Sequence, residues 1–196
     1  GDYSVLDVDI IRGVLDGGWD VNKEMTELGE RLLHSTSMGG SPKAVQLVVE
    51  HGADVDLQNY EGSTPLLLAC VKNRTENVKV LLDSGASPNI SGKEGLTPLH
   101  VASTRNNIMM IDMLVEHGAS IDAQLSEEAT HDNIKIGGYS PLHFALAVHV
   151  NHMQIIDAPG IGVEYSLSLR EAIVALTMNG ANWDLRDAKG ETPAEL

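Results

Sequence analysis

The chain has 196 residues, 42% of them hydrophobic, which is enough apolar material to build a folded core. Its formal net charge of −15 argues against binding to nucleic acid or anionic lipid, because both require clustered Lys and Arg. No apolar run approaches the roughly 18 residues of a membrane span, and no signal-peptide pattern is visible, so we expect an intracellular protein, cytoplasmic or nuclear, without membrane insertion.

Two short motifs recur along the chain at a nearly fixed period. Gly-Ala, or Gly-Trp in the first copy, begins at Gly18, Gly52, Gly85, Gly118 and Gly180, and Thr-Pro or Ser-Pro ends at Pro65, Pro98, Pro141 and Pro193. Successive glycines lie 34, 33, 33 and 62 residues apart, and successive prolines lie 33, 43 and 52 residues apart. Both series indicate a repeat of about 33 residues with two insertions, which is the signature of a repeat architecture.

Residues 97–118 show which structure the sequence of one repeat predicts. Thr97 can cap a helix through its hydroxyl, and Pro98 suits the first helical position, where no backbone N–H is needed. This first helix is predicted to end near residues 106–107, after which Ile111 and Leu114 recur at helical spacing on a second helix. Gly118 can end the second helix in a left-handed conformation. Each repeat is therefore predicted as a turn followed by two helices.

These motifs resemble the ankyrin-repeat family, whose unit reads D-x-x-G-x-T-P-L-H-x-A-A, followed by a Leu/Val-rich helix that ends in G-A-D. The pattern stands at residues 62–66, 95–102 and 140–145, and residues 29–53 give a degenerate copy in which Arg31-Leu32-Leu33-His34 replaces T-P-L-H. The resemblance implies an all-α solenoid of helix-turn-helix units joined by β-hairpin-like turns. It covers nearly the whole chain, so we expect a single ankyrin-repeat domain over residues 1–196.

The two ends of the chain fall inside repeats. Residues 5–18 look like only the second helix of a unit, and residues 190–196 open a unit that stops at Leu196. About four full or near-full repeats lie between these partial ones. A terminal repeat needs a polar outer face, because each unit buries its apolar side only against its neighbours. We therefore expect a piece of a longer protein, or a chain with unusual caps.

The resemblance implies a protein-protein interaction module, a scaffold or adaptor that binds a partner through its concave face. The acidic charge favours a partner with a neutral or basic surface or peptide. The family's variable positions on hairpin tips and first helices give the candidate partner-binding residues Tyr60, Glu61, Lys72, Lys93, Glu94 and Arg105. Tyr60 is the best single anchor, since aromatic and Arg side chains dominate binding hot spots.

The two insertions are further candidates for binding, because a repeat array tolerates extra length only in its connections. The first, residues 124–137, is predicted to lengthen a hairpin. The second, residues 150–167, separates the two helices of one repeat and is too apolar for a solvated loop. It either packs back on the array or offers Tyr165 and its apolar neighbours to a partner.

Histidines stand at the same position of three repeats, at His34, His100 and His143. In ankyrin repeats this position is similar to a structural hydrogen-bonding residue near the capping Thr, and we interpret all three in that way. A second group, His149 and His152, lacks the spacing of known zinc sites. We therefore expect no bound metal.

Catalytic motifs are absent from the sequence. The chain has no G-x-S-x-G, no phosphate-binding loop and no G-x-G-x-x-G, and its single Cys70 lies in an apolar run that indicates burial. We therefore expect neither an enzyme nor a cofactor; a metal-dependent enzyme built on the His149 region is the less favoured alternative.

Residues 139–196 are also similar to the last repeats of the mind bomb ubiquitin ligases. The similarity lies in a long insertion between two helices, a final helix, and the ending Arg-x-x-x-Gly-x-Thr-Pro. It implies an alternative function, the substrate-recognition segment of a multidomain ubiquitin ligase. The chain itself has no cysteine pairs that could bind the zinc of such a ligase.

Asparagines in ankyrin hairpins are sometimes hydroxylated by an oxygen-sensing dioxygenase. Asn22 and Asn89 stand at the matching distance after the glycine of the repeat, although Pro88 replaces the usual Val or Ala. The resemblance therefore implies Asn22 and Asn89 as candidate hydroxylation sites.

Overall fold

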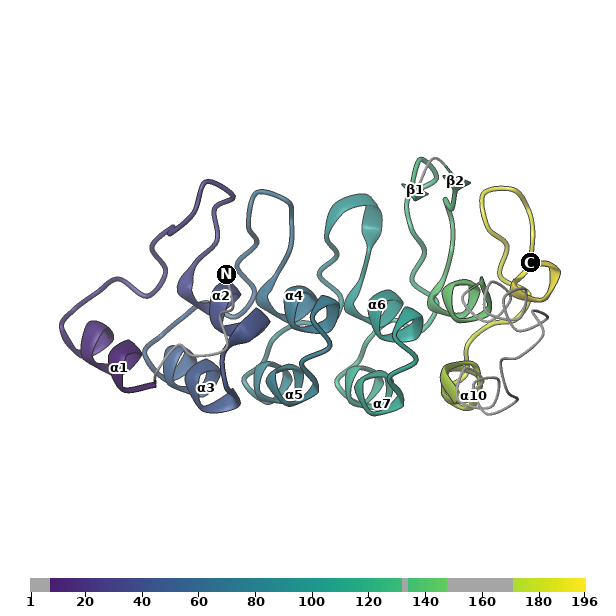
Figure 1. Ribbon diagram of the computed structural model, residues 1–196. Helices are drawn as coiled ribbons and strands as arrows, with labels where there is room; N and C mark the ends of the chain where they lie inside the picture. Colours follow the sequence, from purple (N-terminus) through teal and green to yellow (C-terminus); the bar gives the residue numbers. More distant parts are fainter. Residues whose placement is uncertain (1–7, 132–133, 148–170) are drawn as a thin grey trace, which may run out of the picture. The chain divides into compact units, whose positions relative to one another are not determined.

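The computed structural model describes residues 8–131, 134–147 and 171–196, and these form helical repeats (Figure 1). The chain divides into two compact units, Gly1–Lys93 and Glu94–Leu196. Each unit is built from successive pairs of helices, and the hairpins between pairs extend away from both helices of the pair (Figure 1).

The first unit contains five helices among its described residues. They are α1 (Val8–Asp16), α2 (Leu32–Gly39), α3 (Pro42–Glu50), α4 (Pro65–Val71) and α5 (Thr75–Asp83). The first helices of successive repeats, α2 and α4, pack side by side, and the second helices α1, α3 and α5 form a parallel layer (Figure 1). Helix α1 therefore has the place of a second helix, as the sequence predicts.

The second unit repeats this arrangement with one longer hairpin. Its elements among the described residues are η1, a 3₁₀ turn that starts at the unit boundary (Lys93–Gly95), α6 (Pro98–Thr104), α7 (Ile108–Glu116), β1 (Thr130–His131), β2 (Ile134–Lys135), a helix described over residues 141–147, α10 (Glu171–Met178) and η2 (Pro193–Glu195). Strands β1 and β2 pair antiparallel, with Thr130 opposite Lys135. Helix α7 packs against both α6 and α10.

The first helices begin at the caps that the sequence predicts. The Thr97 hydroxyl accepts the backbone N–H of His100, and Pro98 occupies the first helical position. Helix α6 ends two residues earlier than expected, because Asn107 caps the next helix by accepting the N–H of Met110 at 3.1 Å. Helix α7 stops before Gly118, whose φ of 86° lies in the left-handed region.

The core lies between the two helical layers of each unit. Its largest fully buried side chains include Leu33, Leu66, Leu81, Leu99, Met110, Ile111 and Leu114. Cys70 is completely buried among them, and burial raises the pKa of its thiol. The expectation that Cys70 is a core residue is confirmed.

In three of the repeats, a histidine joins the first helix to the following hairpin. The Nδ1 atom of His100 accepts the backbone N–H of Thr97 at 3.2 Å, so Nε2 carries the proton and donates to the carbonyl oxygen of Tyr139 at 3.0 Å. Equivalent bonds run from His34 to Ser63 at 3.2 Å and from His143 to Glu191 at 3.3 Å. Each acceptor immediately precedes the cap of the next first helix. The structural role predicted for these histidines is confirmed.

Truncation of the core should destabilise the fold. Leu99 is fully buried, so Leu99→Ala is expected to lower the free energy of unfolding by about 2–5 kcal/mol through lost apolar contact and a residual cavity. Met109→Ala on the exposed side of α7 is the control and should change it by less than about 0.5 kcal/mol. Chemical denaturation of both variants measures this, and equal losses would contradict the assignment of Leu99 to the core.

The buried histidine should make stability depend on pH. Burial lowers the pKa of His100 to about 4, whereas an unfolded histidine titrates near about 6.5. Between these values the unfolded chain binds more protons, so stability is lost as pH falls, by about 1.4 kcal/mol per pH unit for this residue. Denaturation at several pH values should show a smaller slope for His100→Gln than for the wild type, and equal slopes would contradict the burial of a neutral His100.

Candidate protein-binding surface

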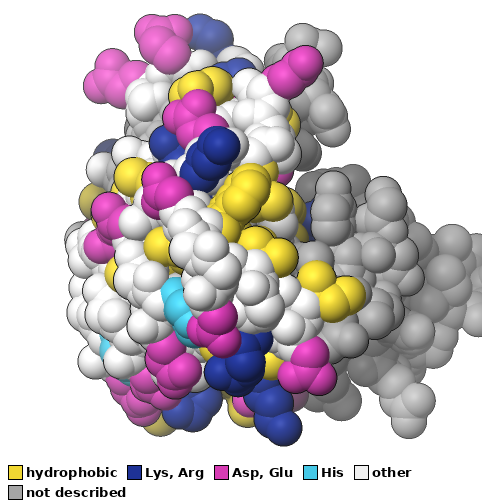
Figure 2. All heavy atoms as spheres, turned by 90° about the vertical axis from the view of Figure 1, so that its left-hand side faces the viewer, with side chains coloured by type: hydrophobic (Ala, Val, Ile, Leu, Met, Phe, Trp, Pro, Cys, Tyr) yellow, Lys and Arg dark blue, Asp and Glu magenta, His cyan; other side chains and the backbone are white. Residues whose placement is uncertain are grey.

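The predicted partner-binding residues occupy hairpins and the ends of first helices. In the first unit Tyr60, Glu61 and Lys93 lie exposed on hairpins, and Lys72 lies exposed at the end of α4. In the second unit Arg105 lies exposed at the end of α6, whereas Glu94 is half-buried. Figure 2, a view onto the α1 end of the first unit, shows hydrophobic side chains exposed among acidic ones.

Some candidates fall outside the described residues. These are Tyr165, the whole second insertion of residues 150–167, and the histidines His149 and His152. Whether the second insertion packs on the array or contacts a partner stays a prediction.

Tyr60 connects the hairpin before α4 to the hairpin before α2. Its hydroxyl donates to Oε2 of Glu24 at 2.7 Å, and its backbone N–H donates to the carbonyl oxygen of Leu28 at 2.8 Å. The ring covers Gly29 so closely that a Cβ atom there would lie 2.8 Å from two ring carbons. Tyr60 is 68% exposed, yet it is also part of the contact between repeats.

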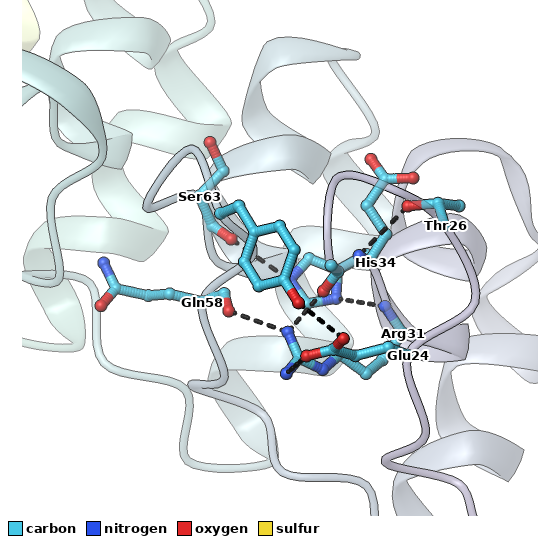
Figure 3. A network of polar contacts seen from close by, with 9 residues as sticks. Glu24, Thr26, Arg31, His34, Gln58 and Ser63 are labelled. Atoms are coloured by element: carbon cyan, nitrogen blue, oxygen red, sulfur yellow. Dashed lines mark hydrogen bonds and ion pairs between the residues drawn. The ribbon is translucent and has the colours of Figure 1, made fainter.

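Arg31 shares the Glu24 carboxylate with Tyr60. Figure 3 labels Arg31 and Glu24 within this network. Its guanidinium forms an ion pair with Oε1 of Glu24 at 2.9 Å and donates to the carbonyl oxygens of Gly29 and, at 3.0 Å, Gln58. We call Glu24, Arg31 and Tyr60 the Glu24 clamp. Arg31 stands where the other repeats have a capping Thr or Ser, so this repeat replaces a hydroxyl cap with a charged bridge between hairpins.

Sequence reasoning missed the contribution of residues 24–28 to this surface. The hairpin before α2 lacks the Thr-Pro motif, and none of its residues stood out by position. The structure shows Met25 and Leu28 exposed at its tip, 49% and 48% respectively. Apolar residues between charged ones, in Glu24-Met25-Thr26-Glu27-Leu28, were the available signal.

Glu94 supports the longer hairpin of the second unit. Its Oε2 atom accepts the backbone N–H of Thr130 at 3.2 Å, and its carbonyl oxygen accepts the N–H of Ser126 at 2.8 Å. At the base of this hairpin Leu125 and Ala129 are buried in a small apolar cluster. The first insertion thus extends a hairpin whose base is packed, and Glu94 has a structural role besides any contact with a partner.

Asn22 takes part in a series of bonds between hairpins. Its Nδ2 donates to the carbonyl oxygen of Gly52 at 3.2 Å, and its Oδ1 accepts the N–H of Asp54 at 2.9 Å. In the next repeat Asp56 accepts the N–H of Ser87 at the same distance. Both Asn22 and Asn89 are exposed, and their hydroxylation stays a prediction.

Other kinds of site receive no support from the described residues. Within residues 8–131, 134–147 and 171–196, no group of three or more His, Cys, Asp or Glu side chains is placed to hold a metal ion. None of the helices in this part of the chain is both long and apolar enough to cross a bilayer.

The Glu24 clamp should change the titration of Tyr60. The hydrogen bond to Glu24, and the charge of that carboxylate, raise the pKa of Tyr60. NMR titration of ring-labelled tyrosine should therefore find the pKa of Tyr60 above the ordinary value of about 10, and Glu24→Gln should lower it. Burial raises the pKa of Tyr139 as well, and Glu24→Gln should leave the pKa of that residue unchanged. Glu61→Gln is the control and should leave the pKa of Tyr60 unchanged; an unchanged pKa of Tyr60 in Glu24→Gln would contradict the clamp.

Known proteins are similar to this chain over the same repeats. A model of ankyrin repeats in three copies matches residues 6–92, and a model of a single ankyrin repeat matches residues 94–125. Human 2-5A-dependent ribonuclease is 37% identical over 65 residues, which are 33% of this chain and 9% of the ribonuclease. The potassium channel AKT1 of Oryza sativa, in both the indica and japonica subspecies, is 35% identical over 63 residues, which are 32% of this chain and 7% of the channel.

A solved structure extends the similarity to nearly the whole fold. The crystal structure of the ankyrin repeat domain of Bcl-3, a member of the IkappaB protein family, matches with a TM-score of 0.73 at 23% identity. The match covers 96% of this chain and 72% of that domain, and at this identity it shows the fold alone. The helix pairs, the histidine bonds and the matched models lead to one conclusion: the chain belongs to the ankyrin-repeat family, and its fold is the all-α ankyrin solenoid.

Proposed function

We propose that this chain is a scaffold or adaptor that binds a partner protein through its hairpins and first helices, the concave side of an ankyrin array. Ankyrin repeats are in general non-catalytic modules for protein-protein interaction. The binding side is supported most directly by the difference in exposure between the residues of the repeat motif and the residues at variable positions. Motif residues such as Leu66 and Leu99 are buried in the stack, whereas Tyr60, Lys72 and Arg105 are exposed on hairpins and at first-helix ends.

The charge of the chain supports a neutral or basic partner. With 28 acidic and 13 basic residues, the surface attracts cations and repels nucleic acid. Long-range attraction of this kind mainly accelerates association and falls as salt screens the charges. We propose an intracellular site of action, cytoplasmic or nuclear, as the sequence suggests.

A second candidate function is substrate recognition within a multidomain ubiquitin ligase. The pattern of residues 139–196 supports it, since its insertion and final helix are similar to the last repeats of the mind bomb ligases. The curated relatives named above match over less than a tenth of their own length. Transfer of ubiquitin to a captured partner, by the whole protein that contains this chain, would favour this function over that of a plain scaffold.

Capture of a partner from cell extract tests the binding side. Lys72→Ala and Arg105→Ala remove donors from the ends of α4 and α6, and together they should weaken binding by about tenfold, as loss of a contributing contact does. Lys79→Ala on α5 is a matched control, because Lys79 is an exposed lysine on a second helix. The Lys72→Ala and Arg105→Ala variants and the Lys79→Ala control should all unfold at the same denaturant concentration as the wild type.

The opposite result would place the binding site elsewhere. If Lys72→Ala and Arg105→Ala leave the affinity unchanged while Asp112→Arg on α7 abolishes it, the partner uses the second helices. If no extract yields a specific partner for the wild type, the proposed function fails.

A further inference from the structure

We infer that the tips of the two hairpins before α2 and α4 form a docking surface for a basic peptide segment that also carries apolar side chains. The surface consists of Met25, Leu28 and Tyr60, with Glu27 and Glu61 beside them, and we call it the Leu28 patch. The inference rests on the proposed function, since it names the surface and the chemical class of the partner for the same binding activity.

The apolar members of the Leu28 patch are neighbours. The carbonyl oxygen of Leu28 accepts the backbone N–H of Tyr60 at 2.8 Å, which places these residues side by side on adjacent hairpins. Met25 lies on the opposite arm of the first hairpin, where its N–H donates to the carbonyl oxygen of Glu30 at 2.8 Å. The Tyr60 ring, lying over Gly29, extends from one arm toward the other. The three side chains are 49%, 48% and 68% exposed in the order Met25, Leu28, Tyr60.

Three other repeats of this chain have polar residues at the same two positions. When hairpins are aligned on the caps Arg31, Thr64, Thr97 and Thr192, Leu28 corresponds to Glu61, Glu94 and Lys189, and Met25 corresponds to Gln58, Ser91 and Arg186. The hairpin before Ser140, which carries the first insertion, has Gly137 and Ile134 at these offsets. The repeat architecture therefore does not require an apolar residue at either position. Exposed apolar groups that folding does not require are typical of a surface that a partner covers.

The charges around the patch select the partner. Glu27 and Glu61 are exposed, and the Glu24 side chain is 45% exposed. Of the nearby cations, Arg31 is 15% exposed and already paired with Glu24, and the Lys23 ammonium lies 5.0 Å from the centroid of the Trp19 ring. The tips are thus apolar with an excess of negative charge. A segment in which Lys or Arg alternates with Leu, Ile or Phe complements both features.

The side chains of the patch suit an extended or helical peptide rather than one rigid shape. Met is unbranched and adapts to irregular partners, and Tyr60 offers a flat ring whose far edge is fixed by Glu24. The partner's apolar side chains would contact Met25 and Leu28, and its cations would reach Glu27 and Glu61. This arrangement separates apolar anchors from the charged rim, as in other protein interfaces.

Selection from a library of short random peptides, displayed on phage and panned on the whole chain, tests the inference. Selected peptides should combine Lys or Arg with Leu, Ile or Phe, and their synthetic forms should bind with an affinity that fluorescence anisotropy can measure. Test variants take residues from the equivalent positions of later repeats, so that they keep the fold: Met25→Gln, Leu28→Glu and Glu27→Lys. Leu28→Glu and Glu27→Lys should each raise the Kd by about tenfold or more.

Matched controls separate the patch from exposed residues elsewhere in the first unit. Ile10→Gln on α1 removes a side chain that is 64% exposed, and Glu50→Lys on α3 makes the same charge change as Glu27→Lys. Both controls should change the Kd by less than about twofold, because neither lies on a hairpin. Unfolding curves of all variants should coincide with that of the wild type.

Three results would overturn the inference. If selected peptides bind the patch variants as tightly as they bind the wild type, the Leu28 patch is not the docking surface. If capture of a protein partner nevertheless depends on Lys72 and Arg105, the proposed function stands without the Leu28 patch. If the chain self-associates in light scattering and Leu28→Glu abolishes this, the patch binds a second copy and not a basic peptide. If neither a peptide nor a protein partner binds the wild type, the inference and the proposed function both fail.

Discussion

In three repeats, the bond from a first-helix histidine to the carbonyl oxygen ahead of the next cap is the contact on which the position of the following hairpin depends. Helix α4 has Leu67 in place of this histidine. In His100 one ring nitrogen fixes the start of its own helix while the other holds the following hairpin. A single buried side chain thereby sets both the position of a helix and the direction in which the next turn leaves it. Because the ring must stay neutral to accept at Nδ1, burial, which lowers the pKa of His100, favours the protonation state that this bond requires.

Within one repeat, the residues that pack against neighbouring helices differ from the residues that are exposed on the hairpin. Leu66 and Leu99 are buried, whereas the hairpin tips carry side chains that folding leaves free to vary. The hairpin before α2 departs from the repeat motif, since Arg31 replaces a hydroxyl cap and Leu28 stands where three other repeats have a charged residue. The same hairpin exposes Met25 and Leu28. Loss of the motif and gain of a distinct surface coincide there, as expected if selection acted on binding at this end of the first unit.

The sequence alone predicted the parts of the structure that depend on local rules. Thr97, Pro98 and Gly118 mark the ends of helices because capping and φ preferences act within a few residues. It could not predict that Tyr60 binds Glu24, since the two are 36 residues apart and neither belongs to the motif. Tyr60 was expected to lie outside the stack, yet its contacts join two hairpins. Pairings of this kind follow from the register between repeats, which only the folded structure provides.

The close approach of Tyr60 to Gly29 restricts the order in which this surface can evolve. Gly29 has a φ of 70°, and an added methyl group would also meet the tyrosine ring, which could move aside only by leaving Glu24. While Tyr60 is present, a mutation at Gly29 therefore both strains the backbone and displaces the tyrosine ring. After Tyr60 has been replaced, only the backbone strain remains. The two positions are epistatic: in a lineage that loses the glycine, the tyrosine should be lost first, and sequences that keep an aromatic residue at position 60 should keep glycine at position 29.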